Sequence, residues 1–397
     1  MSELWVVNVA RATCRRPRRL VGAAGAAALV VALAAVPGTG AAAAGRMSYP
    51  VLQNVGPRYT TAGGAAVLPT TRTVPHWNGS FVDGADGQTY GYNMVGTPPA
   101  GSGSTTVGVD LIPLNVSFTA DGGWALDAST ETSWVEASPI FTPTPMPSGE
   151  TAQYLDAVMR SEFNQIGSGY HVQLSPNILP AASITVPPNQ GQLYYAQDEI
   201  TVLGLVNQAW FAAQVQSLLA SSQLDPTRLH VVITTNVFLY QKSAVNCCTL
   251  GFHGGAHPTG MGTGSAHGNG DQPVQTFAWA SWVPSPDIFG AGSTDVVALS
   301  HEISEWGHDP FDTNDVNPWL VKGSGYGCTK LLETGDPLVG VDFPAGSTNP
   351  EPTTGPAPGP WDLQDEAFLW WFARNATQAS NGAYSYIGTF GSPAPTC

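Results

Sequence analysis

Hydrophobic and polar residues alternate over much of the chain after residue 76. The segments WNGSFVDGADGQTYGYNMVG (77–96) and TTVGVDLIPLNVSFTADG (105–122) place aromatic or β-branched residues between turn residues, a pattern typical of successive strands. Two later runs, at 228–240 and 275–283, are also rich in β-branched and aromatic residues and predict further strands. We therefore expect a β-rich N-terminal portion and additional strands downstream.

Hydrophobic residues recur at helical spacing in three places. The segments 150–165 and 199–220 predict two helices, and a third is expected at about 295–307. Ser, Thr and Asp at 293–295 are suited to begin the third helix, and Gly307 with the nearby proline is suited to end it. The order of these elements predicts an α+β fold with a mixed sheet, a backing helix and a late helix.

Length and composition allow one large folded domain or two smaller ones, with many turns. The chain has 397 residues, of which 43% are hydrophobic and 11% charged, with 45 Gly and 33 Pro, enough apolar residues for a core and many for loops. We expect an extended lead-in at 46–72 and a single domain at 73–397. The proline-rich stretch at 344–360 is predicted to be a surface loop inside that domain.

The first 45 residues have the pattern of an export signal. Four arginines at 15–19 precede an apolar segment from Leu20 to Val36, and the small residues GTGAAAAG follow. We therefore predict a signal peptide at 1–45 and an extracellular mature chain. The alternative is a membrane anchor, but the segment is rich in Ala and Gly and is shorter than a typical span of ~20 residues. No stable membrane anchor is expected after cleavage.

The charge balance excludes one class of partner. The net charge is −15, and loss of residues 1–45 removes five Arg and one Glu, so the mature value is −15 − 4 = −19. An acidic surface of this kind repels phosphate groups. Nucleic acid is therefore not expected as a partner.

Four cysteines remain after loss of the signal: Cys247, Cys248, Cys328 and Cys397. An even number in an exported protein predicts two disulfides. Cys247 and Cys248 are not expected to pair with each other, because α-carbons across a trans peptide lie ~3.8 Å apart, below the usual range for a disulfide. The favoured pairing joins one of them to Cys328 and the other to Cys397, and free buried thiols are the alternative.

The third predicted helix carries the candidate chemistry, in the sequence HEISE at 301–305. On a helical wheel Glu305 falls about 40° from His301, whereas Glu302 lies about 100° away and apolar residues occupy the far side. An imidazole and a carboxylate one turn apart suit a metal ion, as in the HExxH pattern, in which the residue after the first His is the general base. Glu305 would replace the second His, and carboxylate oxygen is an accepted zinc donor.

A metal needs a third ligand, and the alternative to a metal is a His–Glu pair on a solvated helix face. We rank Glu333 first and Asp336 second as the third ligand, with His308 and Asp309 as further candidates. Zn²⁺ is the expected ion, and Ca²⁺ or Mn²⁺ also suit a set so rich in oxygen. His253, predicted to lie in a Gly-rich loop, is a candidate for substrate binding, although a solvated loop His is the blander interpretation.

The sequence resembles a family of secreted bacterial proteins with zincin-like metal motifs and, more distantly, the plant Exordium or phosphate-induced proteins. The resemblance is carried by segments along almost the whole mature chain, among them TVPHW (73–77), TAQYLDAVMRSEF (151–163), CCTLGFHG (247–254), HEISEWGHDPF (301–311) and LLETGDPL (331–338). It implies that His301, Glu302, Glu305, Glu333 and Asp336 belong to one site. The expected order of sheet, backing helix and metal-bearing helix is also that of the zincins, which is an analogy of fold.

The sequence supports two competing functions. The first is a secreted, zincin-like metallopeptidase in which Glu302 activates water for attack on a peptide or protein substrate. The second is an extracellular binding or signalling protein of the Exordium kind, in which the metal is structural. A third interpretation has no metal at all.

Overall fold

The structure is a computed structural model that describes residues 49–50, 58–61, 73–244, 247–256, 273–284, 288–289, 293–320, 328–346 and 360–397. Ser48–Cys397 cluster into one compact unit. The predicted signal peptide at 1–45, most of the lead-in at 46–72 and most of the proline-rich stretch lie outside the described residues. Within the lead-in, β1 (Arg58–Thr61) pairs in parallel with a strand of the main sheet.

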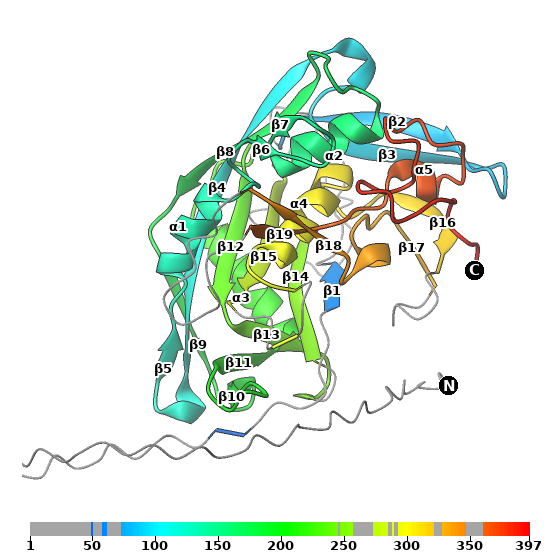
Figure 1. Ribbon diagram of the computed structural model, residues 1–397. Coiled ribbons are helices and arrows are strands. Elements are labelled where there is room, and N and C mark those ends of the chain that lie inside the picture. Colours follow the sequence, from blue (N-terminus) through cyan, green and yellow to red (C-terminus); the bar gives the residue numbers. More distant parts are fainter. Residues whose placement is uncertain are drawn as a thin grey trace, which may run out of the picture. The chain divides into compact units, whose positions relative to one another are not determined.

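A curled mixed sheet of eleven strands forms the centre of the unit (Figure 1). Its main path runs in the order β10-β11-β13-β14-β15-β12-β4-β5, while β8 and β9 also pair with β4 and β1 pairs with β14. Besides β1, its strands are β4 (Ser104–Phe118), β5 (Trp124–Leu126), β8 (His171–Ile178), β9 (Ala182–Val186), β10 (Gly191–Tyr195), β11 (Val202–Asn207), β12 (Leu229–Thr235), β13 (Val237–Tyr240), β14 (Cys247–Ala256) and β15 (Gln275–Trp282).

Smaller elements surround the sheet. Four two-stranded ribbons are formed by β2 (His76–Val82) with β3 (Thr89–Val95), β6 (Thr144–Pro145) with β7 (Thr151–Ala152), β16 (Asp315–Trp319) with β17 (Thr329–Leu331), and β18 (Asp342–Ala345) with β19 (Trp361–Gln364). The α-helices are α1 (Ser129–Ala137), α2 (Tyr154–Glu162), α3 (Gln208–Ser221), α4 (Val297–His308) and α5 (Leu369–Phe372). Short 3-10 turns lie at Pro99–Gly101, Thr119–Asp121 and Asp336–Leu338.

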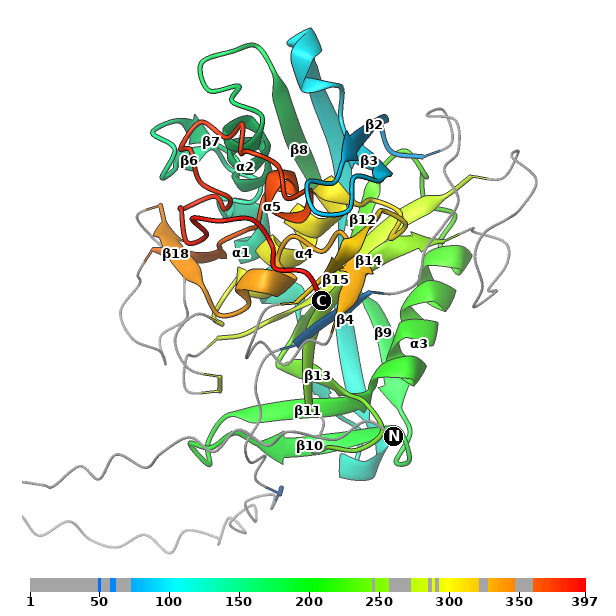
Figure 2. The same cartoon turned by 90° about the vertical axis from the view of Figure 1, so that its right-hand side faces the viewer.

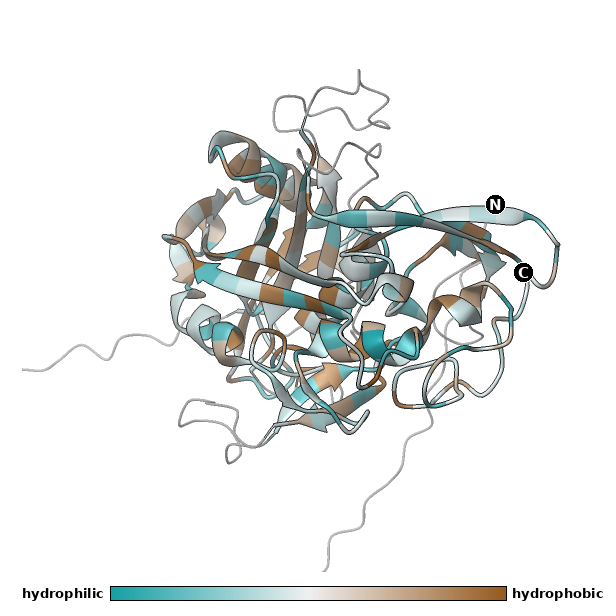
Figure 3. Ribbon diagram, turned by 90° about the horizontal axis from the view of Figure 1, so that it is seen from above, coloured by the Kyte–Doolittle hydropathy of each residue, from teal (hydrophilic) through white to brown (hydrophobic). Residues whose placement is uncertain are grey.

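Helices cover both faces of the sheet, which explains why its central strands are hydrophobic throughout. Figure 2 shows α3 on one side of β12, β14 and β15 and α4 on the other. Neighbouring residues of one strand enter different cores, since Val231 joins the cluster beneath α4 and Val232 joins the cluster beneath α3. Hydrophobic segments recur along the strands in Figure 3. The helix with the candidate motif therefore lies directly on a sheet.

The sequence predicted several of these elements correctly. The N-terminal strands are present as β2, β3 and β4, the helix at 150–165 as α2, the strand at 275–283 as β15, and the third helix as α4. The α+β class with a mixed sheet is confirmed in this general form.

Two predicted elements were wrong in part. The expected helix at 199–220 begins only at Gln208, and its first third is strand β11, because Asn207 caps the helix by accepting a hydrogen bond from Trp210 N. The expected strand at 228–240 is two strands, β12 and β13, separated at Asn236, whose φ is +54°. In both cases one Asn near the middle of an apolar run marks the break.

The predicted disulfide pairing was also wrong. Cys247 is bonded to Cys248, and Cys328 is bonded to Cys397. The expectation assumed a trans peptide between the first pair, whereas that peptide is cis and the two α-carbons are 3.0 Å apart. Four cysteines thus form two disulfides as expected, with different partners.

None of the helices in the described ranges is long and apolar enough to cross a bilayer.

The Cys328–Cys397 disulfide fixes the C-terminus and is expected to stabilise the fold. It joins residues 69 positions apart, and the chain-entropy model gives about 4 kcal/mol for a loop of this length. The double variant Cys328→Ser, Cys397→Ser should therefore unfold at a clearly lower urea concentration than the parent chain. Parent and variant should behave alike once both are fully reduced. Equal midpoints under oxidising conditions would contradict this prediction.

Candidate metal centre

The helix α4 is buried along its whole length. All twelve residues from Val297 to His308 are buried, and the helix contacts β14, β15 and β19 of the sheets together with α2. His301 and Glu302 are 0% exposed and Glu305 is 3% exposed. The alternative of a His–Glu pair on a solvated face is therefore wrong, and the polar side chains of the motif lie inside the protein.

His301 and Glu305 lie together as their spacing predicted. His301 Nε2 is 3.1 Å from Glu305 Oε2. The other oxygen of Glu305 accepts hydrogen bonds from the backbone N–H groups of Gly335 and Asp336, at 3.1 and 3.2 Å. These two backbone bonds fix the carboxylate so that Oε2 faces the imidazole.

The same backbone bonds bring the predicted downstream ligands to the helix. Asp336 Oδ1 lies 3.8 Å from His301 Nε2. Glu333 shares a group of mutually close ligand atoms with Glu305 and His253, all within 4.8 Å of one another. Both downstream acids that the sequence ranked highest thus lie near α4, but Glu333, which is 2% exposed, groups with His253 and Glu305 and not with His301, so the predicted ligand set of His301, Glu305 and Glu333 is not one group of close ligand atoms.

His253 also belongs to this cluster, although the sequence placed it in a loop. It lies on β14, opposite Ala278 of β15, and is fully buried. Its Nδ1 is 3.1 Å from Glu302 Oε2 and 3.6 Å from Glu305 Oε2. The Gly-rich composition suggested a loop, but glycine on this face of the strand leaves room for the side chains of α4. A role in substrate binding remains a prediction.

Two other candidate ligands lie elsewhere. His308 is the last residue of α4. Its Nε2 is 2.6 Å from Glu162 Oε2, and its Nδ1 is 2.7 Å from Ser304 O. Asp309 accepts hydrogen bonds from the backbone N–H groups of Thr313 and Asn314. His308 therefore links α4 to the end of α2, and Asp309 holds the loop that follows α4. Among the described residues, neither belongs to a group of close ligand atoms.

Sequence reasoning missed Gln364, which orients His301. The Nε2 amide of Gln364 donates to Gly335 O at 2.7 Å, so its Oε1 is the acceptor for His301 Nδ1 at 3.1 Å. This contact assigns a proton of the imidazole to Nδ1, so Nε2, which lies 3.1 Å from Glu305 Oε2, would be the ligand atom for an ion. Second-shell partners of this kind are usual for metal-binding His, but a lone Gln 63 residues downstream gives no signal in the sequence.

Two glycines allow the close packing. A Cβ at Gly335 would overlap the His301 ring, and a Cβ at Gly251 of β14 would overlap the carboxyl group of Glu302. Glu302 therefore lies against the β14 backbone, between Gly251 and His253. Space at the site depends on the absence of side chains at these two positions.

Burial and mutual repulsion shift the pKa values at the site. Burial, together with the neighbouring Glu305 carboxylate, raises the pKa values of Glu302 and Glu333 well above the usual range. Burial also raises the pKa of Glu305, but His301, His253 and a hydrogen bond with Glu333 together outweigh it, so the pKa of Glu305 is lowered. Burial lowers the pKa of His253 to about 4, so this imidazole is neutral at pH 7 and has a lone pair for a metal.

The cluster fits a divalent cation better than any other compensation visible at the site. Among the described residues no Lys or Arg forms an ion pair with Glu302, Glu305 or Glu333. Both oxygens of Glu333 and Nε2 of His253 are buried and have no hydrogen-bond partner there, which is costly unless a ligand supplies one. Ligands around a tetrahedral zinc are about 3.3 Å apart, close to the 3.1 Å that separates His301 Nε2 from Glu305 Oε2.

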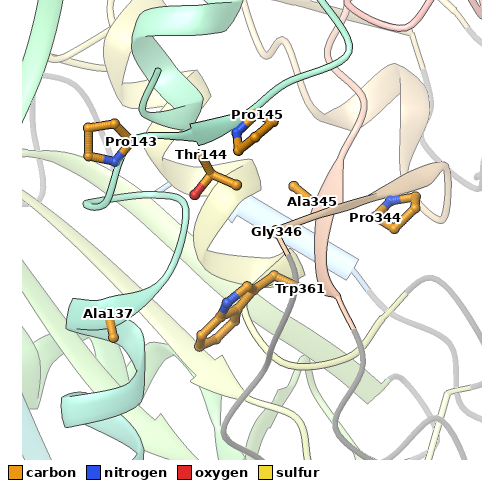
Figure 4. Close-up of a pocket in the computed structure, with 8 residues that line it drawn as sticks. All are labelled: Ala137, Pro143, Thr144, Pro145, Pro344, Ala345, Gly346 and Trp361. Carbon is orange, nitrogen blue, oxygen red and sulfur yellow. The ribbon is translucent and has the colours of Figure 1, made fainter. Parts of the chain in front are cut away.

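The structure also has a pocket of about 580 Å³ (Figure 4). It is lined by residues of α1, β6, β18 and β19 and by neighbouring loop residues: Ala137, Pro143, Thr144, Pro145, Pro344, Ala345, Gly346 and Trp361. None of the candidate ligands lines it. The pocket and the centre share only β19, which carries Trp361 at one end and Gln364 at the other.

Comparison of the chain with protein-family models, curated proteins and solved structures finds no match.

Gly335→Ala is expected to weaken metal binding, because the added methyl group would displace His301 from its place against the loop. Gly391→Ala is the matched control, since a Cβ at that position meets no atom within 4 Å. We expect a loss of zinc affinity of at least tenfold for Gly335→Ala and no change for the control, measured by competition with a chromophoric chelator. Equal affinities in the two variants would contradict the proposed geometry.

The stability of the metal-free protein should depend on pH in a direction set by these acids. Glu302 and Glu333 have folded pKa values raised above the ordinary 4.5, so the folded state retains protons that the unfolded chain loses. The unfolding free energy should then fall as the pH rises above about 4.5, by up to about 1.4 kcal/mol per pH unit for each group. Glu305 acts oppositely, and its contribution is lost only at lower pH.

Urea unfolding at pH 5, 6, 7 and 8, with chelator and with zinc, measures this dependence. The stabilisation by zinc should grow with pH, because the ion binds deprotonated ligands. Glu333→Gln should flatten the slope of the metal-free protein. Identical slopes with and without zinc would rule out the cluster as their origin.

Proposed function

We propose that this chain is a secreted metal-dependent hydrolase that cleaves peptide bonds. The observation that carries the proposal is that Glu305 lies in two buried groups of close ligand atoms, one with His301 and Glu302 and the other with His253 and Glu333, and that both Glu333 oxygens have no hydrogen-bond partner among the described residues. A polar cluster of this composition is costly to bury without a cation. The cation that it invites is the usual source of an activated water in hydrolases.

Zinc is the proposed ion. Two imidazoles, from His253 and His301, lie among the donors, and imidazole favours zinc and other transition metals over calcium or magnesium. Manganese is the alternative that the many carboxylates allow. When bound, the ion would polarise the scissile carbonyl and acidify a water molecule.

The side chains of the centre then have distinct tasks. Gln364 holds the His301 tautomer, and the backbone of Gly335 and Asp336 holds Glu305. Glu302 is the proposed general base, and it accepts the proton of the attacking water. Burial and the neighbouring Glu305 raise its pKa, and a higher pKa makes a carboxylate a stronger proton acceptor.

Secretion, peptide specificity and a zincin-like fold are supported by the sequence more than by the site. The two disulfides are compatible with an oxidising compartment, and residues 1–45 have the pattern of a signal peptide. Peptide bonds are proposed because the helix with HEISE and the downstream Glu resemble zincin metal motifs.

One observation favours a second candidate function, a binding protein with a structural metal. The donors are almost completely enclosed, and the largest exposure among them is 9%, at Asp336. Closed sites are typical of structural zinc, whereas catalytic zinc keeps a position open to substrate. In this case Glu302 would support His253 and perform no chemistry.

The variant Glu302→Gln separates the two functions. In the hydrolase it should retain the metal and lose at least a hundredfold in kcat/KM, because the amide cannot accept a proton at neutral pH. The measurement is cleavage of a library of internally quenched peptides, with metal content determined in parallel. Glu136→Gln on α1 is the matched control.

Full activity in Glu302→Gln would eliminate this residue as the base. Metal-loaded parent protein that cleaves no peptide would favour the structural metal site. Parent protein that binds no divalent ion would eliminate both functions.

A further inference from the structure

The donors of the centre form two groups that share one residue. One group consists of His301, Glu302 and Glu305, and the other of His253, Glu305 and Glu333. Glu305 belongs to both, and its Oε1 is already occupied by two backbone N–H groups. Its other oxygen, Oε2, is close to the imidazole of each group: it is 3.1 Å from His301 Nε2 and 3.6 Å from His253 Nδ1.

The two imidazoles are held in similar ways. Each has its Nδ1 against a side-chain oxygen at 3.1 Å, from Gln364 for His301 and from Glu302 for His253. An Nδ1–H donated to a second-shell oxygen leaves Nε2 as the ligand atom, the usual arrangement at metal sites. His253 Nε2 is buried and has no hydrogen-bond partner among the described residues. Each group thus has an imidazole prepared for an ion.

The buried negative charge of the centre also favours two ions over one. Glu302, Glu305, Glu333 and Asp336 are at most 9% exposed and carry a formal charge of −4 when ionised. One divalent ion would leave −2 in a region of low dielectric, whereas two would leave none. No Lys or Arg of the described chain pairs with the three glutamates to supply the difference.

We propose that the centre binds two divalent cations bridged by Glu305, one beside His301 and Asp336 and the other beside His253 and Glu333. The proposal rests on the metal centre of the proposed function and specifies its nuclearity. Two ions about 3.5–4 Å apart are a recurring arrangement in hydrolases. His253 is then a ligand of the second ion, and Glu333, which the sequence assigned to the first ion, belongs to the second.

The test is metal stoichiometry. Parent protein loaded with Zn²⁺, freed of excess ion and analysed by plasma mass spectrometry should contain two ions per chain. His253→Ala and His301→Ala should each retain one ion, and Glu305→Ala should lose both. His230→Ala is the matched control, because this buried His of β12 pairs with Asp110 away from the centre, and it should retain two.

Two further measurements keep the test decisive. Where His253→Ala does not fold, Glu333→Gln, which preserves the shape of the side chain, should contain one ion per chain. Parent protein loaded with Mn²⁺ should show the electron paramagnetic resonance of a spin-coupled pair. A single uncoupled Mn²⁺ signal with one ion per chain would overturn the proposal, as would an undiminished metal content in His253→Ala or Glu333→Gln.

These outcomes are distinguishable from those that test the hydrolase. One ion per chain, together with activity that is lost in Glu302→Gln, would overturn the paired centre and leave the hydrolase intact. Two ions per chain without hydrolysis would support the paired centre and contradict the hydrolase.

Discussion

The buried negative charge beneath α4 is the constraint on which the rest of the structure depends. Glu302, Glu305, Glu333 and Glu366 are each at most 3% exposed, and burial raises the pKa values of three of them, all but Glu305. A carboxylate in such surroundings must be protonated, hydrogen-bonded or paired with a cation. Among the described residues, two backbone N–H groups donate to Glu305 and the Tyr154 hydroxyl donates to Glu366, so Glu302 and Glu333 are the carboxyl groups that the proposed ion would compensate.

The fold has room for this cluster between α4 and the sheet because small residues lie on the sheet face beneath the helix. On the face of β14 and β15 beneath α4, Gly251 lies opposite Ala280, and His253 lies opposite Ala278. On the other face of the same two strands the facing pair is Phe252 and Trp279, packed beneath α3. Small residues on one face and large ones on the other let the sheet hold a polar centre on one side and an aromatic core on its back.

The sequence was most informative where chemistry follows local periodicity. The spacing of His301 and Glu305 requires only a helix, which forms at Val297–His308, although its N-cap is Val296 and not one of the predicted residues at 293–295, and the helix continues one residue past Gly307. Glu333 was a reasonable choice because ligands downstream of such a helix are a known pattern. His253 and Gln364 could not be placed, because their positions follow from the pairing of β14 with β15 and of β18 with β19, which local patterns do not encode. The disulfide partners were missed because a cis peptide between non-proline residues is rare.

The centre draws its side chains from β14, α4, the loop before Asp336, and β19, over the interval from residue 253 to residue 364. Only His301, Glu302 and Glu305 lie in one short stretch of the chain, so an unfolded polypeptide lacks the rest of the proposed coordination sphere. If the chain is exported unfolded, it cannot carry its ion from the cytoplasm. The ion would then be acquired after the second half of the domain has closed, and the available supply outside the cell would select its identity.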